Sequence, residues 1–278
     1  MTNHIDGKVI IITGAGSGFG KLAAAKLAQR GGRIVCADID GDAAQRTAKD
    51  IVDAGGTAIS VAADVRKIED MQAVAESTVN AYGAIDVMVN NAGIMPLAYL
   101  ADHSDALPAW NKCIDINFKG VMNGSIAVFD QMTAQERGHI VNMSSIYGNR
   151  PTAGAAVYGA TKAAVDYFSH ALRQEGRGKI KVTVVKPTGV MATGLAGTVV
   201  NPAAGLGIVG HNAASFYEDY EKLSSGEAPA VMTDPESINY AFLDPEHIAD
   251  AVVHVIDQPW GISLSDITVR ASADHYIP

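Results

Sequence analysis

Apolar and polar positions follow two different patterns along the chain. Short runs of consecutive apolar residues are separated by longer segments in which apolar residues recur every three or four positions. A strand buried on both faces produces the first pattern, and an amphipathic helix produces the second. The predicted strands are residues 9–13, 34–38, 58–62, 85–90, 139–144 and 181–186, with a final strand at 267–270.

Helical segments fill the gaps between these strands. Regular alternation of strands and helices indicates a parallel sheet that is covered by helices on both faces. We therefore predict a single doubly wound α/β domain over residues 1–278, with about seven strands. The predicted helices include residues 21–30, 43–54, 71–82, 106–131 and 156–174, and a last helix that carries His247 and His254.

One stretch, residues 191–243, breaks this alternation. It is rich in glycine and proline, and it lies between a predicted strand and the last helix. A segment of this length is usually functional, and it is often a lid. We expect a substrate-binding loop or lid within the domain; packing as a contact between subunits is the alternative.

The composition excludes several classes of protein. The net charge is −9, and such a surface repels phosphate backbones, so nucleic acid is not an expected partner. No apolar run approaches the roughly 18 residues of a membrane span, and the start of the chain lacks the apolar core of a signal peptide. Cys36 and Cys113 fit neither a disulfide framework nor a metal spacing, and no histidine pair has the spacing of a zinc site. We expect a cytoplasmic protein that uses no metal.

Glycines gather where the first predicted strand meets the first helix. Gly14, Gly18 and Gly20 lie there, with Ser17 and Phe19 between them. Glycines allow a tight turn and a close approach of the backbone to a pyrophosphate at the helix N-terminus. An ordinary turn is the alternative, but the strand before and the helix after favour a dinucleotide site.

Asp38 ends the second predicted strand, 18 residues after Gly20. A carboxylate at this place can accept a hydrogen bond from the ribose 2′-hydroxyl of NAD, and it would repel the 2′-phosphate of NADP. Ile39 and Asp40 follow, and neither is basic. Asp38 could instead cap the next helix, although Asp40 is better placed to do so. The sequence therefore predicts NAD rather than NADP.

Tyr158 and Lys162 are four residues apart in a predicted helix, so they share a face. A phenol has an ordinary pKa of about 10, and a nearby ammonium group lowers it by stabilising the phenolate. The same spacing is also common on solvent-exposed faces. The pair alone therefore assigns no function.

Several motifs occur together in one order. From about residue 8 to 193, and more loosely to 270, they make the chain resemble the short-chain dehydrogenase/reductase family. The resemblance implies a Rossmann fold and an NAD(H)-dependent oxidoreductase that interconverts a secondary alcohol and a ketone. The matching residues are Thr13-Gly14-x3-Gly18-x-Gly20, Asn90-Asn91-Ala92-Gly93, Tyr158-x3-Lys162, Ser145 at 13 residues before the tyrosine and Asn117 at 41 residues before it.

The resemblance implies a role for each catalytic residue. Tyr158 would be the general acid/base, and Lys162 would lower its pKa and hydrogen-bond the nicotinamide ribose. Ser145 would hydrogen-bond the substrate oxygen, although Ser144 is a rival for this role. Asn117 would hold a water that connects Lys162 to solvent; the alternative is a helix-interior asparagine that bonds backbone.

The resemblance also implies further cofactor contacts. Asn91, Ala92 and Gly93 would line the cofactor through their backbone, whereas Asn90 would connect neighbouring strands. Asp64 and Val65 resemble an adenine-contacting pair, and capping of the next helix is the alternative.

Pro187, Val190 and Thr193 would lie near the nicotinamide. The chain departs from the family here, because Thr188 replaces a glycine and Ala192 stands where relatives carry a threonine. The contact is therefore better assigned to the Val190 backbone than to Thr193.

Met95, Tyr147, Met191 and Leu195, with Ser145 and Tyr158, are the expected substrate contacts. The residues around them are mostly apolar and include few cations. A charged substrate would call for an arginine clamp, so we expect a neutral, mostly apolar molecule that is cyclic, terpenoid, aromatic or steroid-like.

Two other functions compete with an oxidoreductase. A non-catalytic dinucleotide-binding sensor or scaffold would share the fold but not the intact catalytic set, and a methyltransferase would have no use for Tyr158 and Lys162. The resemblance implies a homo-oligomer, a tetramer or dimer, formed through the helices predicted at 106–131 and 156–174. The last dozen residues, 267–278, could then pack on a neighbouring subunit.

Overall fold

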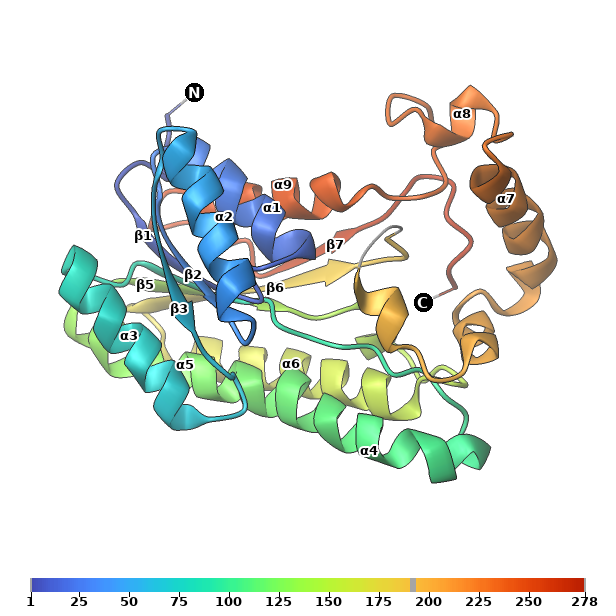
Figure 1. Cartoon of the computed structure of the whole chain (residues 1–278), viewed down its shortest axis with the longest axis horizontal. Helices are drawn as coiled ribbons and strands as arrows, with labels where there is room; N and C mark the ends of the chain where they lie inside the picture. Colours follow the sequence, from blue (N-terminus) through green and yellow to red (C-terminus); the bar gives the residue numbers. More distant parts are fainter. Residues whose placement is uncertain (1, 191–193, 278) are drawn as a thin grey trace.

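The computed structural model describes residues 2–190 and 194–277, and within them seven strands form one parallel sheet (Figure 1). The strand order is β3-β2-β1-β4-β5-β6-β7, and every neighbouring pair is parallel. This confirms the predicted doubly wound sheet. The strands are β1 (Val9–Thr13), β2 (Arg33–Asp38), β3 (Thr57–Ala62), β4 (Val87–Asn90), β5 (Gly138–Met143), β6 (Ile180–Pro187) and β7 (Asp266–Val269).

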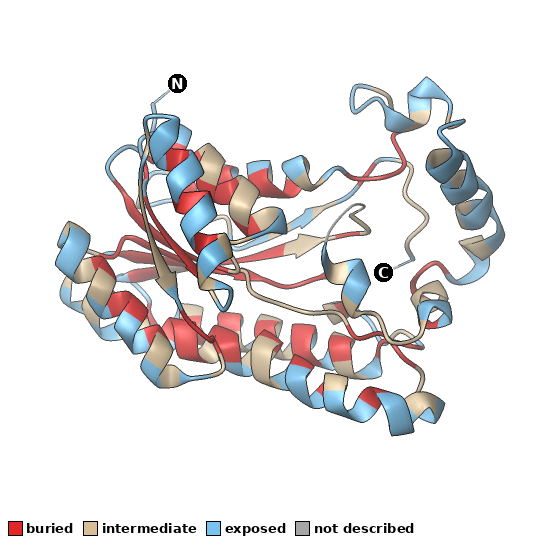
Figure 2. Ribbon diagram, in the orientation of Figure 1, coloured by how far each residue is buried: buried red, intermediate tan, exposed pale blue. Residues whose placement is uncertain are grey.

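Helices cover both faces of the sheet, with α1, α2 and α9 on one face and α3 to α6 on the other (Figure 1). β1, β4 and β5 are buried along their whole length, as continuous apolar runs predict, and the central strands form the core in Figure 2. The helices are α1 (Gly18–Gln29), α2 (Gly41–Asp53), α3 (Ile68–Tyr82), α4 (His103–Ile114), α5 (Gly120–Ala134), α6 (Ala156–Glu175), α7 (Ala213–Ser225), α8 (Ala230–Thr233) and α9 (Pro245–Ile256).

The strand order reverses at β1, which has β2 on one side and β4 on the other. In an open parallel sheet, the crevice at the carboxyl ends of strands beside such a point is the usual ligand site. The expected functional residues follow β1, β2, β3, β4, β5 and β6 at this edge. Asn90 connects two of these strands, as predicted, because its Nδ2 donates to Asn142 Oδ1 at 2.8 Å.

The long helix predicted at 106–131 is helical throughout, but a wider turn in its middle divides it into two α-helices. α4 ends at Ile114, and a π-helical turn, Asp115–Lys119, precedes α5. The wider turn places Asn117 inward with no exposed surface, so that its side chain exchanges hydrogen bonds with the Ile94 backbone. Such turns are frequent at functional sites.

The insert, residues 194–243, is more regular than the sequence suggested. It contains α7, α8 and three short 3₁₀ turns, Gly194–Thr198, Pro202–Ile208 and Gly210–Asn212. It stands off the carboxyl ends of the strands (Figure 1), and α7 has no buried residue (Figure 2). On this mostly exposed helix, the rings of Phe216 and Tyr220, one turn apart, stack on each other.

The tail, residues 270–277, packs on the insert of its own chain. The Ile277 amide donates to the Ile208 carbonyl at 3.0 Å, and Asn212 Nδ2 donates to the His275 carbonyl at 3.0 Å. The sequence had suggested a neighbouring subunit instead. In the part of the chain that the structure describes, no helix is both long and apolar enough to span a bilayer.

Candidate active site

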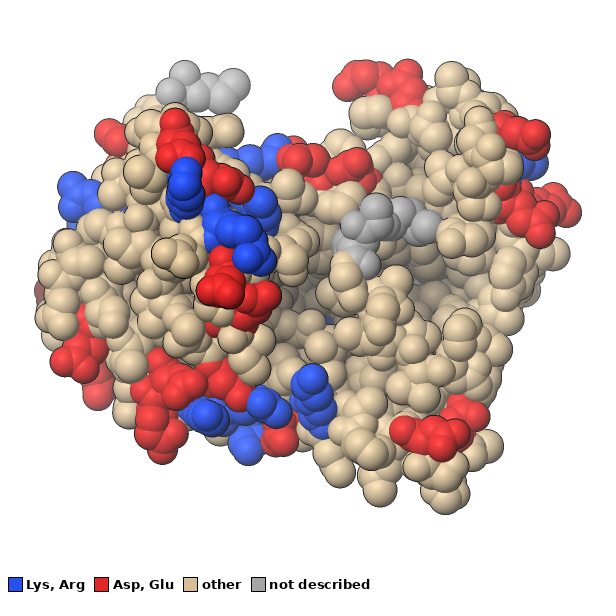
Figure 3. Space-filling view, in the orientation of Figure 1, with Lys and Arg blue, Asp and Glu red and all other residues tan. Residues whose placement is uncertain are grey.

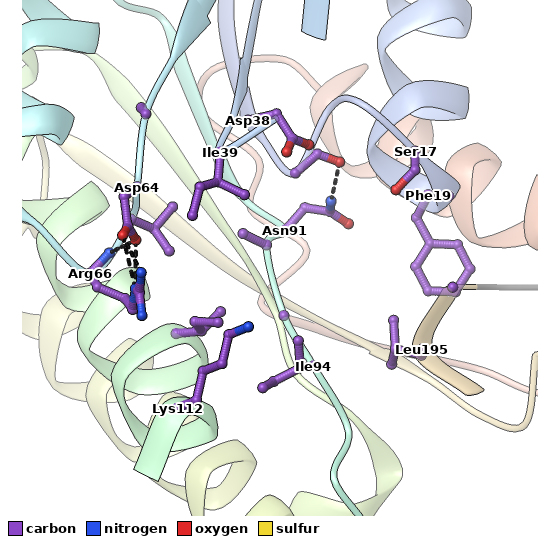
Figure 4. Close-up of a pocket in the computed structure, with 18 residues that line it drawn as sticks. Ser17, Phe19, Asp38, Ile39, Asp64, Arg66, Asn91, Ile94, Lys112 and Leu195 are labelled. Atoms are coloured by element: carbon purple, nitrogen blue, oxygen red, sulfur yellow. Dashed lines mark hydrogen bonds and ion pairs between the residues drawn. The ribbon is translucent and has the colours of Figure 1, made fainter. Parts of the chain in front are cut away.

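Two adjoining cavities lie at the carboxyl edge of the sheet. The first, of about 350 Å³, lies between the glycine turn and the ends of β2, β3 and β4 (Figure 4). The second, of about 510 Å³, lies between the ends of β5 and β6, α6 and the insert. They form one crevice, because five residues line both. These are Phe19, Asn91, Gly93, Ile94 and Leu195.

The glycine turn in the first cavity is fixed from β4. Thr13 Oγ1 accepts hydrogen bonds from the Asn91 and Ala92 amides at 3.0 and 3.1 Å, and Asn91 Nδ2 donates to the Thr13 carbonyl at 2.9 Å. Gly14 has φ +65°, and a methyl group on Gly20 would lie 2.2 Å from the Gly14 carbonyl oxygen. Gly20 therefore serves close packing beneath the turn, whereas Gly14, Ser17, Gly18 and Phe19 line the cavity.

The Asp38 carboxylate faces the same cavity at the end of β2 (Figure 4). Its Oδ2 accepts from the Gly16 amide at 2.8 Å, and its Oδ1 accepts from the Asp40 amide at 3.0 Å. Asp40 caps α2 by accepting from the Ala43 amide at 3.0 Å, as the sequence argument required. Asp38 is therefore oriented by the glycine turn and does not cap the helix.

Sequence reasoning missed Arg66, a cation in the first cavity. Its guanidinium donates to both oxygens of Asp64, from Nε at 2.8 and 2.9 Å (Figure 4). This pairing lowers the pKa of Asp64. Capping by Asp64 is wrong, because Lys67 occupies the cap position of α3; Asp64 and Val65 line the cavity. The sequence did contain a signal for this contact, because Arg66 is a basic residue that closely follows β3, the neighbour of β2.

Tyr158 and Lys162 share the inward face of α6, and both are buried. The exposed-face alternative is therefore wrong. Lys162 Nζ lies 5.8 Å from the centre of the Tyr158 ring and donates to the Met143 carbonyl at 2.8 Å. A methyl group on Gly93 would lie 3.8 Å from Lys162 Nζ and 3.4 Å from Asn117 Oδ1, so these groups converge beside β4.

The pKa values in this site differ from the expectation. Burial lowers the pKa of Lys162 to about 8. Burial also raises the pKa of Tyr158 well above its ordinary value, and a hydrogen bond with Ser145 opposes this only in part. Desolvation of the phenolate thus outweighs the hydrogen bond with Ser145.

Ser145 and Ser144 have different surroundings. Ser144 Oγ donates to the Lys162 carbonyl at 3.2 Å, so its hydroxyl braces α6. Ser145 lies in extended conformation after β5, where it hydrogen-bonds Tyr158 and accepts from the Tyr147 amide at 3.3 Å. The geometry therefore brings Ser145, and not Ser144, to the phenol.

Asn117 is held from outside its own helix. Its Oδ1 accepts from the Ile94 amide and its Nδ2 donates to the Ile94 carbonyl, both at 2.9 Å. Nδ2 also lies 3.4 Å from Thr161 Oγ1, on the α6 turn before Lys162. The asparagine does bond backbone, as the alternative supposed, but that backbone is the segment after β4.

The second cavity is mostly apolar, as predicted. Met95, Tyr147, Leu195, Pro187 and Val190 line it, together with Ser145, Tyr158 and Lys162; the predicted contacts Met191 and Thr193 lie outside the described residues. Among the described lining residues, Lys162 is the only lysine or arginine. Around the hollow beside the insert, Figure 3 likewise shows few charged side chains on the visible face.

Among the residues that line this cavity, sequence reasoning missed Thr188 and Tyr276, which both carry a hydroxyl group. The Thr188 hydroxyl is buried and has no hydrogen-bond partner within residues 2–190 and 194–277. Tyr276 comes from the tail, and no local pattern indicates that contact. The same described residues contain no cluster of three metal-ligating side chains, and both cysteines are buried and unpaired.

Known proteins resemble the chain along most of its length. The family model for short chain dehydrogenase matches residues 8–203. A Listeria monocytogenes protein described as an uncharacterized oxidoreductase is 34% identical, over 95% of this chain and 96% of its own. Another such oxidoreductase, from Staphylococcus saprophyticus, is 29% identical over 98% of each chain.

Two solved structures share the fold. A metagenomic short-chain oxidoreductase in complex with NADP has a TM-score of 0.72 and 27% identity, over 96% of this chain and 98% of that one. An alcohol dehydrogenase from the archaeon Thermococcus sibiricus, complexed with 5-hydroxy-NADP, has a TM-score of 0.76 and 20% identity, over 96% and 97%. On the family match and the 34% identical relative, the chain belongs to the short-chain dehydrogenase family of oxidoreductases.

Proposed function

We propose that the chain is an NAD(H)-dependent oxidoreductase that interconverts a secondary alcohol and a ketone on a neutral, mostly apolar small molecule. One observation carries the proposal. Tyr158, Ser145 and Lys162 meet in an apolar cavity that adjoins the cavity beside the glycine turn.

The residues of the first cavity fit a dinucleotide. The turn at Gly14 leaves no room for a side chain, since a methyl group there would lie 3.0 Å from Asn91 Nδ2. Backbone amides at the start of α1 then suit a pyrophosphate. When bound, the nicotinamide would supply the hydride acceptor or donor.

NAD is the cofactor we propose, although two solved relatives were studied with NADP or a derivative of it. The Asp38 carboxylate supports NAD, because it would accept from a ribose 2′-hydroxyl and repel a 2′-phosphate. Arg66 could counter that repulsion, but its guanidinium already pairs with Asp64.

Tyr158 would move the proton of the reacting oxygen, and Ser145 would hold that oxygen by a hydrogen bond. A raised pKa leaves Tyr158 protonated at neutral pH, which suits it to donate during ketone reduction. During alcohol oxidation the phenolate must accept the proton, and the ammonium of Lys162 would then stabilise it. Asn117 would hold the segment after β4 in place beside Lys162.

We also propose how the rest of the chain serves this reaction. Residues 1–278 would form one domain, and residues 191–243 would act as a lid within it. A homo-oligomer, a tetramer or dimer, is supported by the exposed apolar side chains Ile114, Ile126 and Tyr167 on α4, α5 and α6. Free cysteines support a reducing cytoplasm.

Turnover of secondary alcohols, followed at the absorbance band of the reduced nicotinamide, tests the proposal. Wild type should be active with NAD, and Tyr158→Phe should lose about 10³-fold or more in kcat while its Kd for NAD stays unchanged. Tyr167→Phe is the matched control, since it removes the same atom from an 81% exposed tyrosine on the same helix. Normal turnover by Tyr158→Phe would refute the mechanism. A wild type that binds NAD but converts no alcohol or ketone would favour the sensor or scaffold.

A further inference from the structure

The tail is fastened to the end of the sheet before it reaches the second cavity. Arg270, just after β7, donates to both oxygens of Asp274, from Nε at 3.0 Å and from Nη2 at 2.6 Å. The Tyr276 amide in turn donates to Asp274 Oδ1 at 3.1 Å. These bonds fix where the backbone of Tyr276 lies.

The insert holds the tail from the other side. Asn212 Nδ2 donates to the His275 carbonyl, and His275 Nε2 lies 3.1 Å from Asp219 Oδ2 on α7. One residue beyond Tyr276, the Ile277 amide donates to the Ile208 carbonyl. Tyr276 is therefore clamped on both sides, which is the preorganisation that a specific contact requires.

The Tyr276 ring is directed into the second cavity. It packs at 6.2 Å between ring centres against Phe216 of α7. At the end of β6, a methyl group on Gly189 would lie only 1.6 Å from the Tyr276 hydroxyl oxygen, so glycine is required there. The phenol thus occupies space beside Thr188 and Val190, next to the proposed nicotinamide site.

The Tyr276 hydroxyl has no hydrogen-bond partner among residues 2–190 and 194–277. Burial raises its pKa to about 12, so the hydroxyl keeps its proton at neutral pH and can donate. The hydroxyl oxygen is not among the fully buried unpaired atoms of the described residues, so it is accessible from the cavity and can donate to a ligand that brings an acceptor. The rest of the wall that the insert contributes is mainly apolar.

We propose that Tyr276 is a specificity-determining residue, and that its hydroxyl hydrogen-bonds a second oxygen on the substrate. The inference rests on the proposed function and deepens it: Tyr158 and Ser145 take the reacting oxygen, and Tyr276 takes another. The substrate class is then a diol, or the hydroxyketone formed from it, on an otherwise apolar skeleton. Tyr276 takes no part in proton transfer.

Matched alcohols test this proposal. The probes are cyclohexanol and the 1,2-, 1,3- and 1,4-cyclohexanediols, with kcat/KM measured for each. Wild type should favour at least one diol over cyclohexanol by about 10-fold, the worth of one good hydrogen bond. Tyr276→Phe should bring that ratio to within about 2-fold of unity, because it removes the donor to the second oxygen.

Tyr167→Phe is the matched control, because it removes the same atom from an 81% exposed tyrosine of α6 that does not line the cavity. It should leave the diol preference intact. Tyr147 is unsuitable as a control, since its ring lies 5.4 Å from that of Tyr158.

Three results would overturn the proposal. The first is a wild type that shows no preference for any diol, and the second is a Tyr276→Phe variant that keeps the preference. The third is a rise of about 10-fold in the Kd for NAD without a change in the ratio, which would assign the hydroxyl to the cofactor. Each leaves the proposed function standing, because that function fails only if Tyr158→Phe stays active or wild type is inert.

Discussion

The two cavities adjoin, yet they are built in different ways. The first is walled by strand ends that are hydrogen-bonded to one another, as where Asn91 after β4 holds the carbonyl of Thr13 at the end of β1. The outer wall of the second comes from α7, which has no buried residue, and from the tail. The wall of the first cavity therefore belongs to the core, whereas α7 and the tail pack on the outside of the core.

This difference separates two tasks. A dinucleotide in the first cavity would be held by the sheet itself, where local opening is as costly as global unfolding. Substrate recognition would fall in part to α7, which has no buried residue and can move or change with little effect on the core. Tyr158 and Lys162 lie at the boundary, on a core helix but facing the second cavity.

The largest effect should come from Lys162→Met, at that boundary. We expect a loss of about 10³-fold in kcat, because the phenolate of Tyr158 loses its neighbouring cation. The same change should stabilise the fold. Burial lowers the pKa of Lys162 from 10.5 to about 8, so below pH 8 the chain bears the full cost of burying an ammonium.

The sign of the pH dependence follows from that shift. Between pH 8 and 10.5 the folded chain has lost a proton that the unfolded chain keeps, so the stability of wild type rises with pH. The variant should gain up to about 3 kcal/mol in unfolding free energy at pH 7, and the gain should shrink towards pH 10.5. Urea titrations at pH 7 and pH 10 measure it. A variant that is less stable than wild type at pH 7 would contradict the prediction.

Gly20→Ala tests the rigidity of the first cavity. Its methyl group would lie 2.2 Å from the Gly14 carbonyl oxygen and 2.6 Å from Asn91 Nδ2. Overpacking of this kind costs about 1–3 kcal/mol in unfolding free energy, and the distorted turn should bind NAD at least about 10-fold more weakly.

Gly197→Ala is the control from the insert, where a methyl group meets nothing within 4 Å. It should change neither the unfolding free energy nor the Kd for NAD. Calorimetry measures both quantities. Equal changes in unfolding free energy and in the Kd for NAD at Gly20 and Gly197 would show that the core and the insert do not differ in rigidity.

Prediction from sequence succeeded where the determinants are local. The glycine turn, the acidic end of β2 and the spacing of Tyr158 and Lys162 each reflect a few neighbouring residues and a regular period. It also placed Asn117 in the site, although it missed the π-helical turn that directs Asn117 inward, because such a turn has no periodic signature.

Contacts between distant segments could not be predicted. Tyr276 reaches Gly189 only because the tail turns back after β7. The hydrogen bonds of the neighbouring His275 to the insert likewise join residues more than 50 positions apart. Arg66 carried a local signal, but its pairing with Asp64 is visible only in the structure. The sequence pattern did not predict α7, because glycines lie on both sides of this helix.

Asp38→Asn should have a smaller effect than Gly20→Ala, since it keeps the shape of the first cavity. The amide still accepts from the Gly16 backbone, but it no longer repels a 2′-phosphate. We expect the preference for NAD over NADP in kcat/KM to fall about 10-fold. The control is Asp42→Asn, an acid in the first turn of α2. An unchanged preference would show that Asp38 does not select the cofactor.

The smallest effect should come from Asp219→Asn, which loosens the second cavity alone. It weakens the contact at 3.1 Å between α7 and His275 of the tail. Partly exposed pairs contribute about 0.2–1 kcal/mol, so KM for the alcohol should rise about 2- to 5-fold. The Kd for NAD should stay unchanged, because no described residue of the tail lines the first cavity, and the unfolding free energy should fall by no more than about 1 kcal/mol. Glu218→Gln, one position earlier on the exposed side of α7, should leave all three quantities alone. If Asp219→Asn weakened NAD binding as much as alcohol binding, the two cavities would be coupled, and the insert would have to be regarded as part of the dinucleotide site.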